Sequence, residues 1–367
     1  MMQPELLNKI LPPHMIKDVL NYVLISLFVT VVILFFVLIF HKLSIELQER
    51  RRRRLRARYS AFMRKFFLGR DGTIVRPRTK LGCETLASLC IDKLETSSQE
   101  DQSIIQQYIR GSFIVEHFRK MAESSSLPKR FHAIKTLGYF SLDELKQYFK
   151  DALHEEKADE VKGAIIWAMS RIADKGTLDW ITLTLTSDIS LSSKYNEYVY
   201  SNLIRSFLRK GITDQFLVFL GKLRDDKTIP YLLKRDIIEA CGSSGLHVAS
   251  RTIVDFFYES DDHPAIKIAC MRALGRLRCP EHSGVVSTAL FHEDWRVRSQ
   301  AAQAASCCSE SSIPHLRNLL YDDFYYVRIN AARSLSQLGE KGQALLRSEM
   351  NSGDPFVRDT VRFMLRK

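Results

Sequence analysis

The sequence predicts an all-α protein: an α-solenoid of about eight stacked helical hairpins, preceded by a single transmembrane helix. Two observations predict the solenoid. Val-Arg pairs recur 30 residues apart, at Val297-Arg298, Val327-Arg328 and Val357-Arg358, and a fixed period of about 20–50 residues is typical of stacked repeats. The 367 residues include only 16 glycines and 10 prolines, about 7% against an average of about 12%, which disfavours a turn-rich β architecture.

A third observation predicts the transmembrane helix, over residues 19–41. Val19 to Phe40 are 22 residues without a charge, and as a helix they would reach ~33 Å, against a hydrocarbon core of ~30 Å. The polar residues Ser26 and Thr30 can bond carbonyls of their own helix, so they do not prevent insertion. A cleaved signal peptide is disfavoured because the run is too long and no small-residue cleavage site follows. A buried core helix is rarely apolar on all sides at this length.

The flanking charges predict the orientation of this span. Residues 42–65 carry ten Lys or Arg, whereas the residues before the span carry only Lys9 and Lys17. By the positive-inside rule, the chain after the span is cytoplasmic and residues 1–18 form a short non-cytoplasmic tail. We therefore expect a single-pass membrane protein, and the repeat type described below suggests a bacterial inner membrane.

Residues 42–68 are expected to form a basic juxtamembrane helix. Its apolar residues fall on one helical face, so it either extends the spanning helix or lies on the membrane as an amphipathic helix. That face consists of Leu55, Tyr59, Phe62, Met63 and Phe66. The arginines either only fix the topology, or dock a partner or anionic lipid, to which each would contribute roughly 1 kcal/mol. This candidate lipid-facing cluster consists of Arg50, Arg51, Arg52, Arg53, Arg54, Arg56 and Arg58.

The cytoplasmic part is expected to be helical throughout. Residues 69–82 contain three glycines and Pro77, which predicts a linker, and residues 83–367 are expected to form the solenoid. A short first helix is predicted to end near Leu94, and a long second helix to run from Ile104 to Phe118.

Eight repeat units follow, each anchored on one position in the first turn of its second helix. The anchors are 30 to 38 residues apart, and the eighth residue after the anchor is glycine in three units, at Gly138, Gly242 and Gly275. The unit at Tyr200 is the least regular, because an expected loop over residues 187–194 precedes it. The eight anchor positions are Arg130, Lys162, Tyr200, Lys234, Lys267, Arg298, Arg328 and Arg358.

The pattern Asp-x-x-Val-Arg, followed by small residues, resembles HEAT repeats. These are of the short-period bacterial type also seen in phycobilisome-lyase-like proteins. The resemblance covers roughly residues 101–367 and is most specific at Asp294–Arg298 and Asp354–Arg358. It implies paired antiparallel helices stacked into a curved superhelix, and usually a scaffolding or docking role.

Physical chemistry assigns structural roles to the same motif. Asp294 and Asp354 stand where helix N-caps are needed. Arg298 and Arg358 lie near a helix N-terminus, where a cation gains nothing from the helix dipole. We therefore expect each arginine to reach a carboxylate of its own unit or of the next, which would form a ladder across the repeats.

The sequence gives no sign of catalytic chemistry. It has no glycine-rich phosphate loop and no HExxH, GxSxG or kinase signature. The pairs His154-Glu155 and His292-Glu293 are similar to the His-Glu dipeptides of deoxyhypusine hydroxylase, a HEAT-repeat di-iron enzyme, but there are only two and both are expected in loops. Seven cysteines without a CxxC pair predict reduced thiols, mostly in the core. We expect no enzyme, no catalytic, cofactor-binding or metal-binding residues, and no cofactor.

The charge distribution bears on the partner. Of the net charge of +12, most lies in residues 1–68, with 12 Lys/Arg and 4 Asp/Glu, so the basic composition is no sign of nucleic-acid binding. Positions five and nine past the anchors carry cations that should point to the inner face of the solenoid. This basic stripe is either an ordinary solvated face or a groove for an acidic peptide, an acidic protein surface or an anionic head group. Its members are Lys135, Arg171, Arg205, Arg209, Arg272, Arg276 and Arg333.

The expected function is that of a membrane-anchored scaffold that mediates protein–protein interaction at the cytoplasmic face. One alternative is a regulatory subunit whose span packs against a transmembrane enzyme or transporter. Another is a lyase-type enzyme with HEAT-like repeats.

Overall fold

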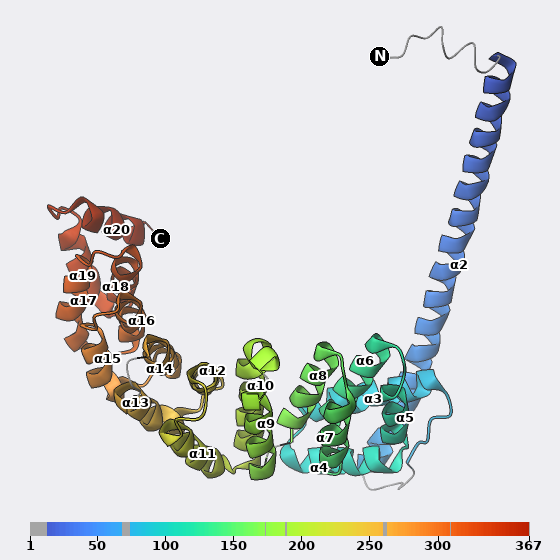
Figure 1. The fold of residues 1–367 in the computed structure, drawn as a ribbon, viewed down its shortest axis with the longest axis horizontal. Coiled ribbons are helices and arrows are strands. Elements are labelled where there is room, and N and C mark those ends of the chain that lie inside the picture. The colour runs from blue at the N-terminus through green and yellow to red at the C-terminus, as the bar shows by residue number, and fades with distance from the viewer. Residues whose placement is uncertain are drawn as a thin grey trace. The chain divides into compact units, whose positions relative to one another are not determined.

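The structure, a computed structural model, describes residues 13–67, 74–172, 174–187, 189–259, 263–308 and 310–366 (Figure 1). All regular secondary structure in these ranges is helical, which confirms the predicted all-α class. Three parts of the expected organisation lie outside them: residues 1–12 of the tail, residue 68 at the end of the juxtamembrane helix, and residues 69–73 at the start of the linker. The chain divides into two compact units: residues 1–93 with 107–114, and residues 94–106 with 115–367.

The first unit is built on one long helix, α2 (Pro13–Phe67). The apolar and basic segments belong to this single unbroken helix, so the basic segment extends the apolar one. Tyr59 and Met63 near its end are buried, and the ring of Phe66 meets that of Tyr108 edge to face, with 5.1 Å between centroids. The apolar face of the basic segment is therefore covered by protein.

Two more helices begin in this part of the chain. Helix α3 (Lys80–Thr96) starts inside the segment expected as a linker. Helix α4 (Gln99–Gly111) ends early because Phe113 adopts a left-handed backbone, with φ of 63°, before α5 (Ile114–Ala122). The single long helix predicted from Ile104 to Phe118 is therefore wrong: the apolar periodicity continues across a residue whose conformation ends a helix.

The second unit contains eight helix pairs, α5–α6 through α19–α20, among the described residues. All eight anchor positions lie on the second helix of a pair. Seven stand in its first turn, as predicted, but Tyr200 is in the middle of α10, because that helix begins eleven residues before it. The helices that follow α5 are α6 (Leu127–Phe140), α7 (Leu145–Glu155), α8 (Asp159–Ser170), α9 (Lys175–Ser187), α10 (Ile189–Lys210), α11 (Thr213–Asp225), α12 (Tyr231–Ser243), α13 (Ser250–Glu259), α14 (Pro264–Leu277), α15 (Ser283–Ala289), α16 (Trp295–Ala304), α17 (Ile313–Leu319), α18 (Tyr325–Gln337), α19 (Gly339–Glu349) and α20 (Pro355–Leu365). Short 3₁₀ turns precede α13, α15 and α17 and follow α16.

The loop expected over residues 187–194 is wrong, because α10 begins at Ile189 and runs for 22 residues. A Ser- and Asp-rich composition favours loops only weakly, and the surrounding structure overrides it.

The second helices of the pairs form one continuous row, which we call the inner row. Each packs on the next, from α6 on α8 to α18 on α20. In Figure 1, α12, α14, α16 and α18 follow the inner side of the arc, and their partners α11, α13, α15 and α17 follow the outer side. This arrangement is the predicted stack of hairpins.

Two of the three repeated glycines mark very close contacts within the inner row. A Cβ placed on Gly138 would lie 2.7 Å from the Cβ of Ala168, and one placed on Gly242 would lie 2.6 Å from the Cα of Ala273. The backbones of α6 and α8, and of α12 and α14, therefore approach closely enough to exclude any side chain at these glycines.

The anchor arginines close the turn between the two helices of a pair. Nη1 of Arg298 donates to the carbonyl oxygens of His292 and Glu293, at 2.9 and 2.8 Å. Its Nε and Nη2 also donate to the carboxylate of Asp322 in the next pair, at 2.7 and 3.1 Å. This confirms the predicted ladder at Arg298, and Arg130 forms the same double ion pair with Glu156, at 2.9 and 3.1 Å.

The last anchor departs from the ladder. Nη1 of Arg358 donates to the carbonyls of Ser352 and Gly353, at 2.6 and 3.0 Å, and no carboxylate among the described residues pairs with it. The prediction of a carboxylate partner is wrong here: Nη1 bonds the two turn carbonyls, as it does in Arg298, but no further helix pair follows α20 among the described residues to supply a carboxylate. The predicted N-caps are confirmed: Asp294 accepts from the backbone N–H of Arg296 at 2.8 Å, and Asp354 accepts from that of Phe356 at 2.7 Å.

Candidate functional site

The basic stripe predicted from the sequence lies on the inner row, distributed over α6, α8, α10, α14 and α18. Five of its seven members line two separate hollows. Arg171 and Arg209 line the first hollow, while Arg272, Arg276 and Arg333 line the second. Lys135 lies beside the first hollow, and Arg205 is an exposed side chain outside both.

The first hollow has a cavity volume of about 210 Å³. Arg171 at the end of α8 and Arg209 on α10 supply its positive charge, and neither forms an ion pair with any described carboxylate. The Arg209 guanidinium donates only to the hydroxyl of Ser206, at 3.2 Å. Polar and apolar groups complete the lining: Leu94, Gln102, Ser103, Gln106, Tyr139, Ser141, Ser206 and Lys210.

Aromatic rings hold the cations beside this hollow. The Arg171 guanidinium lies 5.0 Å from the ring centroid of Tyr139 and 5.4 Å from that of Trp167. The Lys135 ammonium lies 3.2 Å from the centroid of Trp167, which itself donates from its indole N–H to the hydroxyl of Tyr198 at 3.0 Å. Such cation–π contacts contribute about 0.5–2 kcal/mol each, and they fix the two cations in place.

The cations also act on one another. Burial, together with the charge of Arg171, lowers the pKa of Lys135 to about 8. Burial, together with the charge of Arg209, lowers the pKa of Arg171. Glu95 attracts Arg171 without forming an ion pair with it. The first hollow is thus a cluster of like charges that is not neutralised by the protein around it.

The second hollow has a volume of about 290 Å³. It differs from the first because a buried carboxylate already pairs with two of its arginines. Glu239 on α12 is only 7% exposed. It accepts from Arg272 at 3.2 Å and from Arg276 at 2.7 Å. Arg333 donates only to the side-chain carbonyl of Asn330, at 3.4 Å.

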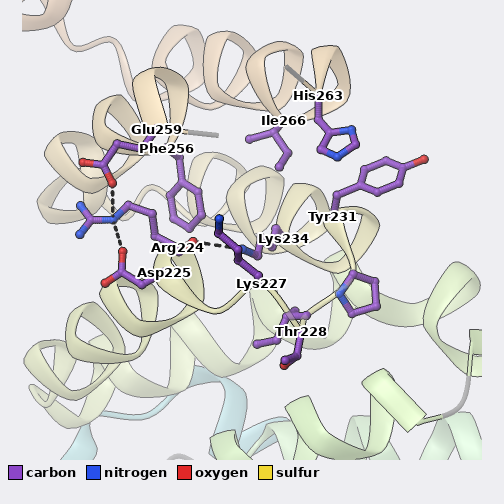
Figure 2. A pocket seen from close by; sticks show the side chains of 12 residues that line it. Arg224, Asp225, Lys227, Thr228, Tyr231, Lys234, Phe256, Glu259, His263 and Ile266 are labelled. Atoms are coloured by element: carbon purple, nitrogen blue, oxygen red, sulfur yellow. Dashed lines mark hydrogen bonds and ion pairs between the residues drawn. The ribbon is translucent and has the colours of Figure 1, made fainter. Parts of the chain in front are cut away.

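A larger hollow, of about 550 Å³, lies at the N-terminal ends of α12 and α14 (Figure 2). The anchor here is Lys234 in place of an arginine, and its ammonium donates to the carbonyl of Arg224 at 3.0 Å. Arg224 pairs with Glu259, 2.9 Å away, while the rings of Tyr231 and His263 stack with centroids 4.7 Å apart. The charged groups of this hollow largely satisfy one another.

A family model described as HEAT repeats matches residues 257–324. The match covers 68 of the 367 residues, so HEAT repeats are shown for this segment. The matched residues begin in α13 and end at the start of α18, so they contain the anchors Lys267 and Arg298. No curated protein matches the sequence.

Several solved structures are similar at low identity. Human deoxyhypusine hydroxylase in complex with glycerol is 13% identical, with a TM-score of 0.28 over 69% of this chain and 94% of that one. An engineered protein is 14% identical, with a TM-score of 0.32 over 61% and 96%. Kap121p bound to Ste12p is 15% identical, with a TM-score of 0.36 over 83% and 38%. At these TM-scores the similarities carry no argument about function.

The two His-Glu pairs lie far apart in the sequence and in different surroundings. His154 and Glu155 are the last two residues of α7, so the expectation of a loop is wrong there. His292 and Glu293 lie in the turn between α15 and α16, as predicted. In the part of the chain that the structure describes, no three His, Cys, Asp or Glu side chains are grouped so that they could hold a metal ion.

Four residues that contact the cations at the two hollows were missed from the sequence. Trp167 and Glu239 stand five residues past the anchors Lys162 and Lys234, and Tyr139 stands nine past Arg130. They occupy the same inner positions as the basic stripe, so a selection of cations alone passed over them. Tyr198 lies before its anchor and carried no signal in the repeat pattern.

The basic cluster on α2 is largely paired within the first unit. Arg50 and Arg53 pair with Glu46 and Glu49 one turn earlier, at 2.6 and 3.5 Å. Arg52 and Arg56 pair with Glu84 and Asp92 of α3, at 3.7 and 2.5 Å. No ion pair to a described residue involves the remaining members, Arg51, Arg54 and Arg58.

Proposed function

We propose that the protein is a membrane-anchored HEAT-repeat scaffold without catalytic activity, whose inner row binds a protein partner at the cytoplasmic face. Stacked repeats expose a long continuous surface suited to recognition. The observation that carries the proposal is the cluster of Arg171 and Arg209 on this surface. Among the described residues neither cation has a carboxylate partner, and an acidic partner would supply one.

The exposure of α2 supports the proposed membrane anchor. Its apolar stretch, with a mean hydropathy of 3.3, is long and apolar enough to cross a membrane, and none of it is buried in the protein. Phe28 and Phe40 are 70% and 78% exposed. A core helix of the same composition would be covered by its own chain, so a bilayer is the environment that we propose for this stretch.

The geometry of α2 favours a stalk over a lipid-binding patch. At ~1.5 Å per residue, Arg50 lies ~15 Å and Arg58 ~27 Å beyond Phe40 along the helix. If α2 stands upright, most of the cluster lies further from the lipid charges than the Debye length of ~8 Å. We therefore assign these arginines to topology and to the ion pairs with α3, with the chain after them in the cytoplasm.

Fractionation tests the anchor and the orientation. The full chain with a C-terminal tag should stay in the membrane pellet after an alkaline carbonate wash, whereas a variant without residues 1–41 should be released. Protease added to inside-out vesicles of a bacterial inner membrane should digest the tag, and protease added to right-side-out vesicles should leave it intact. Release of the full chain by carbonate, or the opposite protection pattern, would contradict the anchor or its orientation.

A further inference from the structure

We infer that the first hollow, between α8 and α10, is a binding pocket for the carboxylate of an acidic side chain presented by a protein partner. The inference rests on the proposed scaffold function and locates the point at which recognition occurs. The pocket is formed by Arg171 and Arg209, with Tyr139 and Ser206 beside them.

The surroundings of the Arg171 guanidinium favour an anionic ligand. Its guanidinium is held against two aromatic rings, its Nε is buried without a hydrogen-bond partner, and no described carboxylate pairs with it. A buried polar group without a partner costs about 1–3 kcal/mol, and more when it is charged. A ligand that accepts hydrogen bonds and carries negative charge would remove that cost.

The two hollows differ in the partners of their arginines. The first presents two arginines from position nine of successive pairs, and the second presents arginines from positions five and nine. Beside the second hollow, Glu239 already accepts from Arg272 and Arg276 with both carboxylate oxygens. The protein thus shows, with its own side chain, the group that two inner-row arginines bind, and the first hollow lacks that group.

The volume of the first hollow and the charge balance of the domain limit the class of ligand. A volume of about 210 Å³ is below the roughly 300–1,000 Å³ of sites for drug-sized ligands, and it suits one acidic side chain. Nucleic acid is disfavoured because residues 69–367 hold 42 Lys/Arg against 38 Asp/Glu, a far weaker excess than a phosphate backbone attracts.

The reactivity of Lys135 can show whether a carboxylate is bound in this pocket. The charge of Arg171 contributes to lowering the pKa of Lys135 to about 8. Neutralising Arg171 with a bound carboxylate should raise that pKa. A rise of half a unit would reduce the neutral, reactive fraction of Lys135 about threefold at pH 7.

The experiment uses the full chain in neutral phosphatidylcholine nanodiscs. The probe is a peptide of alternating Gly and Glu, and the matched control peptide has Gln in place of Glu. We expect the Glu peptide to slow acetylation of Lys135, measured by mass spectrometry, about threefold, and the Gln peptide to leave it unchanged. Arg209→Glu should abolish the protection and weaken peptide binding about tenfold. The control Arg333→Glu makes the same change in net charge as Arg209→Glu, but at the second hollow. In this variant the Glu peptide should still protect Lys135.

Three results would overturn the inference. Equal loss of protection in Arg209→Glu and Arg333→Glu would mean that the peptide responds only to the total charge. Protection by phosphatidylglycerol nanodiscs without peptide would assign the hollow to lipid, and stronger protection by a single-stranded oligonucleotide would assign it to nucleic acid. The acetylation assay needs no natural partner, so a negative result would contradict the pocket but not the membrane-anchored scaffold. Equally, a negative carbonate or protease test would contradict the membrane anchor but not the pocket.

Discussion

Close packing between α12 and α14 gives the most direct test of the fold. The perturbation is Gly242→Ala, which adds one methyl group. The new Cβ would lie 2.6 Å from the backbone Cα of Ala273 and 2.9 Å from its Cβ. Because the obstacle is backbone, it cannot turn aside, and the two helices must separate.

The magnitude follows from two opposing effects. Overpacking a close contact costs about 1–3 kcal/mol, and the better helix propensity of alanine returns about 0.8–1 kcal/mol. Because the obstacle is backbone, we take the upper part of the overpacking range, about 2–3 kcal/mol. The net effect should then be a local destabilisation of about 1–2 kcal/mol, which raises the open population about 5–30-fold. A solenoid unfolds repeat by repeat, so a local measurement is more informative than a single melting curve.

Native-state hydrogen exchange of the full chain provides that measurement. Amides of α12 and α14 should exchange about 5–30-fold faster in Gly242→Ala. Two matched glycines control the experiment: Gly275→Ala, whose Cβ would meet Ala304 at a more tolerable 3.3 Å, should change little, and Gly221→Ala, with nothing within 4 Å, should slow exchange in α11. Equal effects of all three substitutions would refute the reasoning from close approach.

The remaining predictions concern a cap, a carboxylate and a thiol. Asp354→Ala removes the cap of α20 and should destabilise that helix by about 1 kcal/mol, seen as faster local exchange, and an unchanged rate would contradict this. Burial alone would raise the pKa of Glu349, but hydrogen bonds from Tyr321 and Arg317 outweigh it and lower that pKa. The stability from Glu349 should therefore be present above its ordinary pKa of 4.5 and be lost as the pH falls below it, whereas Glu349→Gln should flatten this part of the stability–pH curve. Cys307, the one cysteine that is not buried, should react first with a thiol reagent, ahead of Cys241, whose pKa burial raises.

The period of the sequence located most of the architecture. The anchors at Arg130 and Arg298 were recognisable because one structural role recurs at fixed intervals, and stacking forces each copy into the same environment. The glycine at position 242 could be singled out for the same reason, although the contact that requires it was invisible without the backbone of Ala273. The break at Phe113 was not predictable, since its left-handed backbone interrupts an apolar pattern that continues on both sides.

The candidate site was predictable only in part. Inner positions of the repeat placed Arg171 and Arg209 on one surface, which the structure shows. Whether each arginine was already neutralised could not be read from the sequence, because the partner comes from another repeat: Glu239 reaches Arg276, 37 residues away. The difference between the two hollows therefore appeared only in three dimensions.

The central claim is that the inner row, beside a membrane, binds a protein. Site-specific photo-crosslinking in native membranes tests it most directly, with the crosslinker placed at Arg205 on the inner row. Controls place it at the 61%-exposed Val218 of the outer row and at the 66%-exposed Leu38 of α2. We predict a discrete protein adduct from Arg205 and none from Val218. Adducts from Val218 or Leu38 alone would contradict a scaffold that recognises its partner through the inner row, and a Leu38 adduct would point to a subunit held by its membrane helix.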